Sequence, residues 1–302
     1  MDILEEHQEE YLRWLYEYSS RIVPRDDSVM YYDCTNFYFE CEKEDEEVID
    51  EVTGEIMDGF RKFGLSKEHR PNPIVEMGLF MDNRGIPVSM CLHSGNTCEQ
   101  VTAVPLEKEI LRMTHGKSFI YCADAGLGSY NIRLFNSMGG RGFIVTQSVK
   151  KLGDILKQAV FNDYDYRLLS NDVPVRIERM KEFDRFDEDN RGLYEDFAYK
   201  VIPADHAMDL GLYEEKLLKN GKVQRVKAKG MLKQRVIITF SRKMMEYQRT
   251  VRNRQIERAK NMLRRNDPEE IKKGLRLFGK TKQHITTGAQ LLPIVEDATK
   301  VD

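Results

Sequence analysis

The sequence predicts an α/β protein built on a mixed sheet with helices on its faces. Three strand-like segments come early in the chain, and helical and strand-like segments alternate after them. Three meandering strands followed by this alternation are typical of a mixed sheet with helices on its faces. With 302 residues, 41% of them hydrophobic, the chain can bury the core of one large domain or two modest ones.

The first predicted strand, "VMYYDCTNFYFE" at 29–40, carries the first candidate site residue, Asp33. Both faces of this strand carry mainly apolar and aromatic side chains. Both faces are therefore expected to be covered, and Asp33 is expected to be buried. A buried, unpaired carboxylate is costly. The sequence therefore predicts a hydrogen-bond network, a basic partner or a metal ion beside Asp33.

The other elements follow in chain order. An acidic helix over 4–20 precedes the first strand, and the acidic segment 40–60 is expected to be a solvated loop or a short helix. Residues 73–95 predict two strands joined at Asp82-Asn83-Arg84-Gly85, a hairpin pattern. Beyond them the pattern predicts helices over 105–114, 131–139 and 149–161, and strands over 117–126 and 142–148.

This order brings a second aspartate toward the first. If the first strand is central and the fourth lies beside it, Asp124 approaches Asp33 at the sheet edge where open α/β folds bind ligands. Two neighbouring carboxylates repel each other unless a cation intervenes, and Mg²⁺ prefers such oxygen ligands. The pattern leaves an alternative open, in which Asp33 is a hydrogen-bonded core carboxylate and Asp124 caps a helix.

Charge is distributed unevenly along the chain. Residues 219–282 hold 21 Lys or Arg and five acids, a local charge of +16, so the rest carries −19 because the whole chain carries −3. Clustered Lys and Arg favour contact with nucleic-acid phosphates. The helix predicted over 246–265 has an apolar stripe, so its arginines can equally be a solvated face without a ligand.

Other features exclude several classes of protein. No apolar run has the length of a membrane span, and the acidic N-terminal sequence lacks the regions of a signal peptide, so a cytoplasmic protein is expected. The five cysteines form no CxxC pair, which disfavours a disulfide framework and predicts reduced thiols.

Five segments, in this order, carry a resemblance to a known family: "YYDCTNFYFE", "GLSKEHRPNPIVEMGLFMDNRGIPV", "HSGNTCEQ", "YCADAG" and "RGFIVTQSVKKL". They resemble the catalytic core of DDE transposases from bacterial insertion sequences, the IS-four-like superfamily, which has a β-rich insertion inside an RNase H-like fold. The resemblance implies that Asp33 is the first acid of the catalytic triad and Asp124 the second. It also implies two Mg²⁺ ions, with Mn²⁺ as a substitute, that serve cleavage of the transposon end and strand transfer to target DNA.

The third acid departs from the family's pattern. The family's stretch Tyr-x-x-Arg-Trp-x-Ile-Glu has no counterpart, and the only tryptophan is Trp14. Glu257 is the nearest candidate, although a lone Glu among arginines is usually an ion-pair partner. The expectation is a chain truncated at both ends, with two of three metal ligands and no activity by itself.

On this resemblance, residues 1–161 form the first part of the catalytic core, 162–283 the β-rich insertion ending in a basic helix, and 284–302 a tail. Strands are expected within the insertion at 164–169, 173–178, 197–204, 211–230 and 233–241, with a turn at 219–222. Candidate DNA contacts are Lys67, His69, Arg70, Lys227, Lys229, Arg249, Arg252, Arg254 and Arg258. Expected partners are transposon-end and target DNA, with a homodimer in the transposition complex.

Two alternatives of other classes stay open. A metal-dependent nuclease with an RNase H-like core would need a third acid within this chain, such as Glu257 or Glu99. A non-catalytic DNA-binding remnant would keep the basic helix and carry the aspartates as relics.

Overall fold

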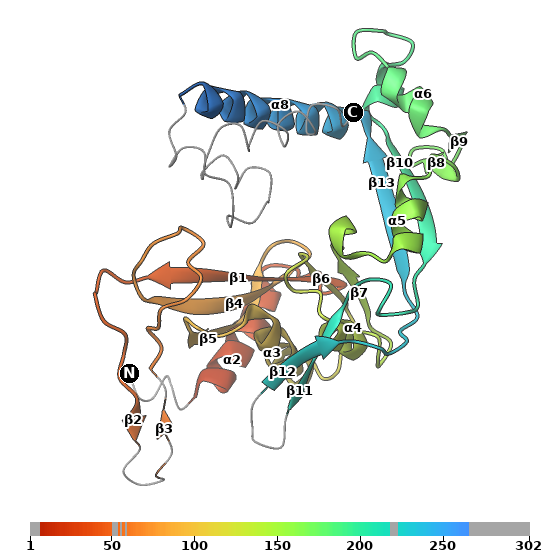
Figure 1. The fold of residues 1–302 in the computed structure, drawn as a ribbon. Helices are drawn as coiled ribbons and strands as arrows, with labels where there is room; N and C mark the ends of the chain where they lie inside the picture. The colour runs from red at the N-terminus through yellow and green to blue at the C-terminus, as the bar shows by residue number, and fades with distance from the viewer. Residues whose placement is uncertain (1–6, 50–53, 55, 58, 218–222, 266–302) are drawn as a thin grey trace. The chain divides into compact units, whose positions relative to one another are not determined.

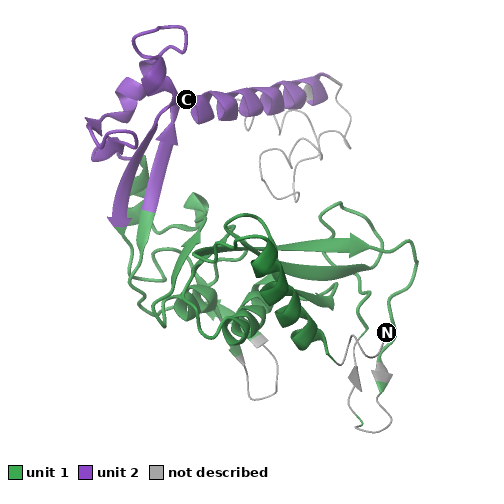
Figure 2. Cartoon of the chain, turned by 180° about the vertical axis from the view of Figure 1, so that it is seen from behind, with its two compact units in different colours: residues 1–161, 203–236 green, residues 162–202, 237–302 purple. Residues whose placement is uncertain are grey.

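The computed structural model describes residues 7–49, 54, 56–57, 59–217 and 223–265. The chain divides into two compact units, which Figure 2 colours separately: unit 1 is Met1–Phe161 with Pro203–Val236, and unit 2 is Asn162–Ile202 with Ile237–Asp302. Unit 2 thus begins where the insertion is predicted to begin. Residues 203–236, assigned to the insertion from the sequence, cluster with unit 1 instead, and the predicted tail lies outside the described residues.

Unit 1 is built on a five-stranded sheet in the order β5-β4-β1-β6-β7. Its strands are β1 (Val29–Tyr38), β4 (Ile74–Asp82), β5 (Pro87–Ser94), β6 (Ile120–Ala123) and β7 (Gly142–Val145). The central strand β1 pairs antiparallel with β4 and parallel with β6. This confirms the predicted mixed sheet, with the first strand in the middle and the fourth segment beside it.

Helices cover one face of this sheet and form the core with it. Figure 1 draws α3 (Glu99–Met113) and α2 (Gln8–Ile22) below the strands. The ring of Tyr32 lies 4.6 Å from that of Phe80, and its hydroxyl is 2.5 Å from Thr102 Oγ1. Both layers contribute buried side chains: Met30, Tyr32, Cys34, Phe80, Ala103, Leu106, Ile110, Phe119 and Tyr121.

The remaining helices of unit 1 follow the predicted order. Helix α4 (Tyr130–Asn136) lies between β6 and β7 in the chain. The helix expected over 149–161 is divided into η1 (Val149–Lys151) and α5 (Asp154–Phe161). The chain turns at Gly153, whose backbone N–H donates to the carbonyl of Asp209.

The prediction that both faces of β1 are covered is wrong. Met30, Tyr32 and Cys34 are buried on the face that packs against α3, whereas Asp33 and Tyr31 on the other face are exposed. The Asp33 side chain is 69% exposed. Aromatic residues on this face suggested burial, but no described helix of unit 1 covers them.

Two hairpins complete unit 1. The segment expected to be a loop or short helix contains β2 (Val48–Ile49) and β3 (Ile56–Met57), which pair antiparallel. The hairpin of β11 (Tyr213–Leu217) and β12 (Val223–Lys227) agrees with the predicted strand pair. Its expected turn at 219–222 lies outside the described residues.

Unit 2 holds a four-stranded sheet in the order β13-β10-β8-β9. The strands are β8 (Tyr166–Leu168), β9 (Pro174–Val175), β10 (Phe197–Pro203) and β13 (Arg235–Ser241), and the helices are α6 (Ile177–Glu182), α7 (Arg191–Glu195) and the basic α8 (Arg242–Arg265). The strand predicted over 173–178 is therefore mostly wrong. Ile177 and Met180 turn inward as helix residues and pack with Tyr166 and Leu168 in the core of this unit.

None of the helices in the described part of the chain is both long enough and apolar enough to cross a bilayer.

Candidate metal and nucleic-acid site

Asp33 and Asp124 come from neighbouring parallel strands. The register pairs Val29 with Ile120 and Tyr31 with Cys122. Continued by two residues, it brings Asp33 level with Asp124, which directly follows the end of β6. Because β6 ends there, the edge of β1 beside Asp33 is free of a neighbouring strand.

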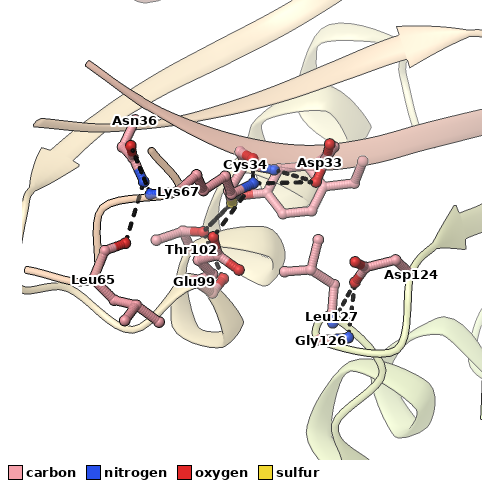
Figure 3. Close-up of polar contacts among 11 residues, drawn as sticks. Asp33, Cys34, Asn36, Leu65, Lys67, Glu99, Thr102, Asp124, Gly126 and Leu127 are labelled. Carbon is pink, nitrogen blue, oxygen red and sulfur yellow. Dashed lines mark hydrogen bonds and ion pairs between the residues drawn. The ribbon is translucent and has the colours of Figure 1, made fainter. Parts of the chain in front are cut away.

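A lysine occupies this free edge. The Lys67 ammonium lies 3.9 Å from Asp33 Oδ1 and 3.6 Å from Glu99 Oε1, and it also donates to the backbone carbonyl of Cys34 (Figure 3). Asp33 Oδ1 accepts a further bond of 2.9 Å from the Cys34 backbone N–H. Lys67, predicted from the sequence as a DNA contact, is therefore the basic partner that Asp33 shares with a second acid.

Asp124 is held in a tight turn of its own. Its Oδ1 accepts backbone N–H bonds of 2.7 Å from Gly126 and 3.3 Å from Leu127 (Figure 3). Gly126 lies between Asp124 and Glu99. A Cβ at this position would lie 3.1 Å from Asp124 Oδ1 and 4.0 Å from Glu99 Oε2. The alternative that Asp124 caps a helix is wrong, because Ser129 caps α4 by accepting the Ile132 N–H.

Glu99 reaches the site from the first turn of α3, where a carboxylate is stabilised by the helix dipole. The sequence indicated it only as an alternative third acid. Asp33 and Glu99 thus meet at the Lys67 ammonium. Asp124 lies in the turn after β6, where Gly126 is near both Asp124 and Glu99.

A further acid, Glu76 on β4, lies next to this group and was missed from the sequence. It is 6% exposed, and its Oε2 has no hydrogen-bond partner among the described residues. Burial raises the pKa of Glu76, as does the nearby Glu99, while Asn36 and Lys67 lower it. The signal in the sequence was a Glu within the apolar strand "PIVEMGLF".

The residues present supply the donors that Mg²⁺ prefers, carboxylates and a backbone carbonyl. Within the described ranges, however, no three His, Cys, Asp or Glu side chains are arranged to hold a metal ion. Asp33 and Glu99 are instead turned to the Lys67 ammonium. The donor chemistry fits such an ion, and in the structure the Lys67 ammonium lies beside Asp33 and Glu99 where the ion would be held.

Glu257, the predicted candidate for the third acid, is on α8 in unit 2. Its Oε1 lies 3.1 Å from the Lys260 ammonium, and its side chain is 62% exposed. In the structure it is the ion-pair partner that its sequence context suggested.

The other DNA-contact candidates occupy three segments. His69 and Arg70 share the exposed segment of Lys67. His69 has a positive φ of 58°, and the Arg70 guanidinium lies 4.8 Å from the Tyr38 ring. Lys227 and Lys229 are exposed in unit 1, at the end of β12 and just beyond it. On α8 in unit 2, Arg254 and Arg258 are exposed, whereas Arg249 and Arg252 are half-buried.

No family model and no curated protein matches this chain. Two solved structures are similar over part of it. The Mos1 transposase paired-end complex with the left transposon end shares 12% identity at a TM-score of 0.25, over 45% of this chain and 40% of that chain. The Mos1 mariner paired-end complex with Mn shares 12% at a TM-score of 0.26 over the same fractions. This chain thus spans less than half the length of either.

Proposed function

We propose that this chain is a DNA transposase of the IS-four-like kind, in which Asp33 and Asp124 hold divalent metal ions during DNA strand cleavage and strand transfer. The observation that carries the proposal is the parallel register of β1 and β6, which, if continued by two residues, aligns Asp33 with Asp124. The five ordered sequence segments support it, and so does the mixed sheet that they build.

The bound metal would supply charge neutralisation and activation of a water or a 3′-hydroxyl. The chain's own residues would do the rest. Asp33 and Asp124 would hold the ions, and the Lys67 ammonium, once it leaves the carboxylates, could pair with a DNA phosphate. Arg70 and the exposed arginines of α8 would add sequence-independent phosphate contacts.

The metal site is tested by iron-mediated cleavage of the chain itself. With Fe²⁺ in place of Mg²⁺, ascorbate and peroxide cut the backbone near the bound ion. We expect fragments that end close to positions 33 and 124, and their loss in Asp33→Asn and Asp124→Asn. Glu68→Gln, which removes an exposed acid beside Lys67, is the matched control. Cuts elsewhere, or cuts that survive both substitutions, would remove the basis of the proposal.

A second candidate, a metal-dependent nuclease with the same core, is favoured by the position of Glu99, which shares the Lys67 ammonium with Asp33. In that case the full chain nicks DNA with Mg²⁺ alone, Glu99→Gln abolishes nicking and Glu257→Gln does not. Products joined to a second DNA molecule distinguish transposition from simple cleavage.

The proposal extends to the assembly. Transposon-end and target DNA would be the partners in the bacterial cytoplasm, and the active form would be a homodimer. Sizing of the chain with and without a terminal DNA duplex tests this part, because a complex with one chain per duplex would exclude the dimer.

A further inference from the structure

A small polar pocket opens beside the turn that holds Asp124. Its walls include Ala125 and Gly128 of that turn, and Gln100, the neighbour of Glu99 on α3. All of its lining residues belong to unit 1. The pocket therefore adjoins the candidate site on two sides.

A buried arginine forms the floor of this pocket. Arg133 is 5% exposed and donates to the Gly128 carbonyl (2.9 Å), Gln234 Oε1 (3.0 Å) and Gln147 Oε1 (2.7 Å). These bonds engage three of the five guanidinium N–H groups. Next to it, Gln234 Nε2 is buried and has no partner among the described residues.

No acidic side chain in the described part of the chain pairs with Arg133. All three of its acceptors are neutral, and its pKa is lowered to about 10 by burial alone, so it remains a cation at neutral pH. A buried charge without an opposite charge is strongly disfavoured. A bound anion would provide the missing negative charge.

The rest of the lining points to the same kind of ligand. Lys151 and Arg225 add two exposed cations, Thr146 and Ser148 add hydroxyls, and none of the lining residues is acidic. The cavity volume is about 30 Å³, room for roughly two water molecules. A tetrahedral oxyanion can present its oxygens there, whereas a nucleobase is too large.

We propose that this pocket binds one phosphate of the DNA backbone, adjacent to the phosphate that lies at the Asp33 and Asp124 carboxylates. The oxyanion site itself depends only on Arg133 and its surroundings. Its assignment to DNA rests on the proposed function. Arg133 orders the pocket, while Lys151 and Arg225 supply the exposed charges that meet the strand.

The first arm of the test measures the site with inorganic phosphate. In the full chain, phosphate should raise the melting temperature above that in chloride of equal ionic strength. The double variant Lys151→Gln/Arg225→Gln should lose most of this increase. Lys150→Gln removes a neighbouring exposed lysine of the same turn that does not line the pocket, and it should behave as wild type.

The second arm uses DNA and no metal. With Asp33→Asn as background and EDTA present, the slope of log K against log salt for a DNA duplex should fall by about 1 to 2 in the double variant, up to one unit for each cation removed. Lys150→Gln should leave the slope unchanged. Because no metal is bound, failure of the proposed catalysis does not affect this measurement.

The outcomes separate the sources of the anion. Loss of both the phosphate effect and the salt slope supports the proposal. A lost phosphate effect with an unchanged slope assigns the pocket to a free oxyanion and overturns the DNA assignment. Equal effects in Lys150→Gln, or none in the double variant, overturn the pocket itself.

Discussion

Removing the Lys67 ammonium should strengthen divalent-metal binding. Lys67 lies 3.9 Å from Asp33 and 3.6 Å from Glu99, with side chains 46%, 69% and 34% exposed respectively. Ion pairs at such exposure are each worth about 0.5–1 kcal/mol. Binding of a divalent ion that displaces Lys67 breaks both ion pairs, which costs roughly 1–2 kcal/mol of binding free energy. Without this cost, Lys67→Gln should bind Mn²⁺ about five- to thirtyfold more tightly.

The assay is titration of the full chain with Mn²⁺, read by loss of the free-ion electron paramagnetic resonance signal. Arg70→Gln is the matched control, because it removes a cation from the same segment that stacks on Tyr38 and contacts neither acid. Asp33→Asn should weaken binding in the Lys67→Gln background. Unchanged or weaker Mn²⁺ binding in Lys67→Gln would refute the view that lysine and metal compete for these carboxylates.

Two further predictions concern the stability of the fold, and a third concerns Glu257. Burial raises the pKa of Glu107 to about 7, compared with about 4.5 in the unfolded chain. Between these two pH values the folded protein binds a proton that the unfolded chain has lost. The free energy of unfolding should therefore fall by roughly 3 kcal/mol as the pH rises from 4.5 to 7. Glu107→Gln, which can still accept from Asn136, should abolish this fall in urea titrations across pH. Tyr32→Phe removes the hydroxyl partner of Thr102 and should cost about 1–2 kcal/mol in the same assay. Glu257→Gln should leave Mn²⁺ affinity unchanged, and a clear loss would reinstate it as a ligand.

The sheet could be predicted because its signals are local. The alternation of apolar residues predicts β1, the turn at Asp82–Gly85 predicts the β4–β5 hairpin, and helical spacing predicts α3. Each of these patterns is complete within a few residues. The order of elements then limits the possible topologies to a few. The sequence did not indicate that residues 203–236 belong to unit 1. Tertiary packing decides which unit the β11–β12 hairpin joins, and no local pattern shows it.

The candidate site was predictable only in part. Asp33 and Asp124 could be found because topology alone brings their strands together. The Lys67 contact could not, because Lys67 is 33 residues from Cys34 in the chain and no sequence pattern between them indicates that the chain returns to β1. Arg133 gave no signal, because an arginine within "NIRLFN" looks like an ordinary exposed helix residue.

The exposure of Asp33 suits metal chemistry better than the predicted burial. On the proposed function, Asp33 would exchange a lysine for a metal ion beside DNA, and a carboxylate in that role has to be reachable from solvent. Strand alternation allows this, because Tyr32 and Cys34 anchor β1 in the core while Asp33 between them faces outward. If the proposed function holds, one face of β1 serves stability and the other serves metal binding. Substitutions at Tyr32 should alter unfolding and leave metal affinity nearly unchanged, and substitutions at Asp33 should do the reverse.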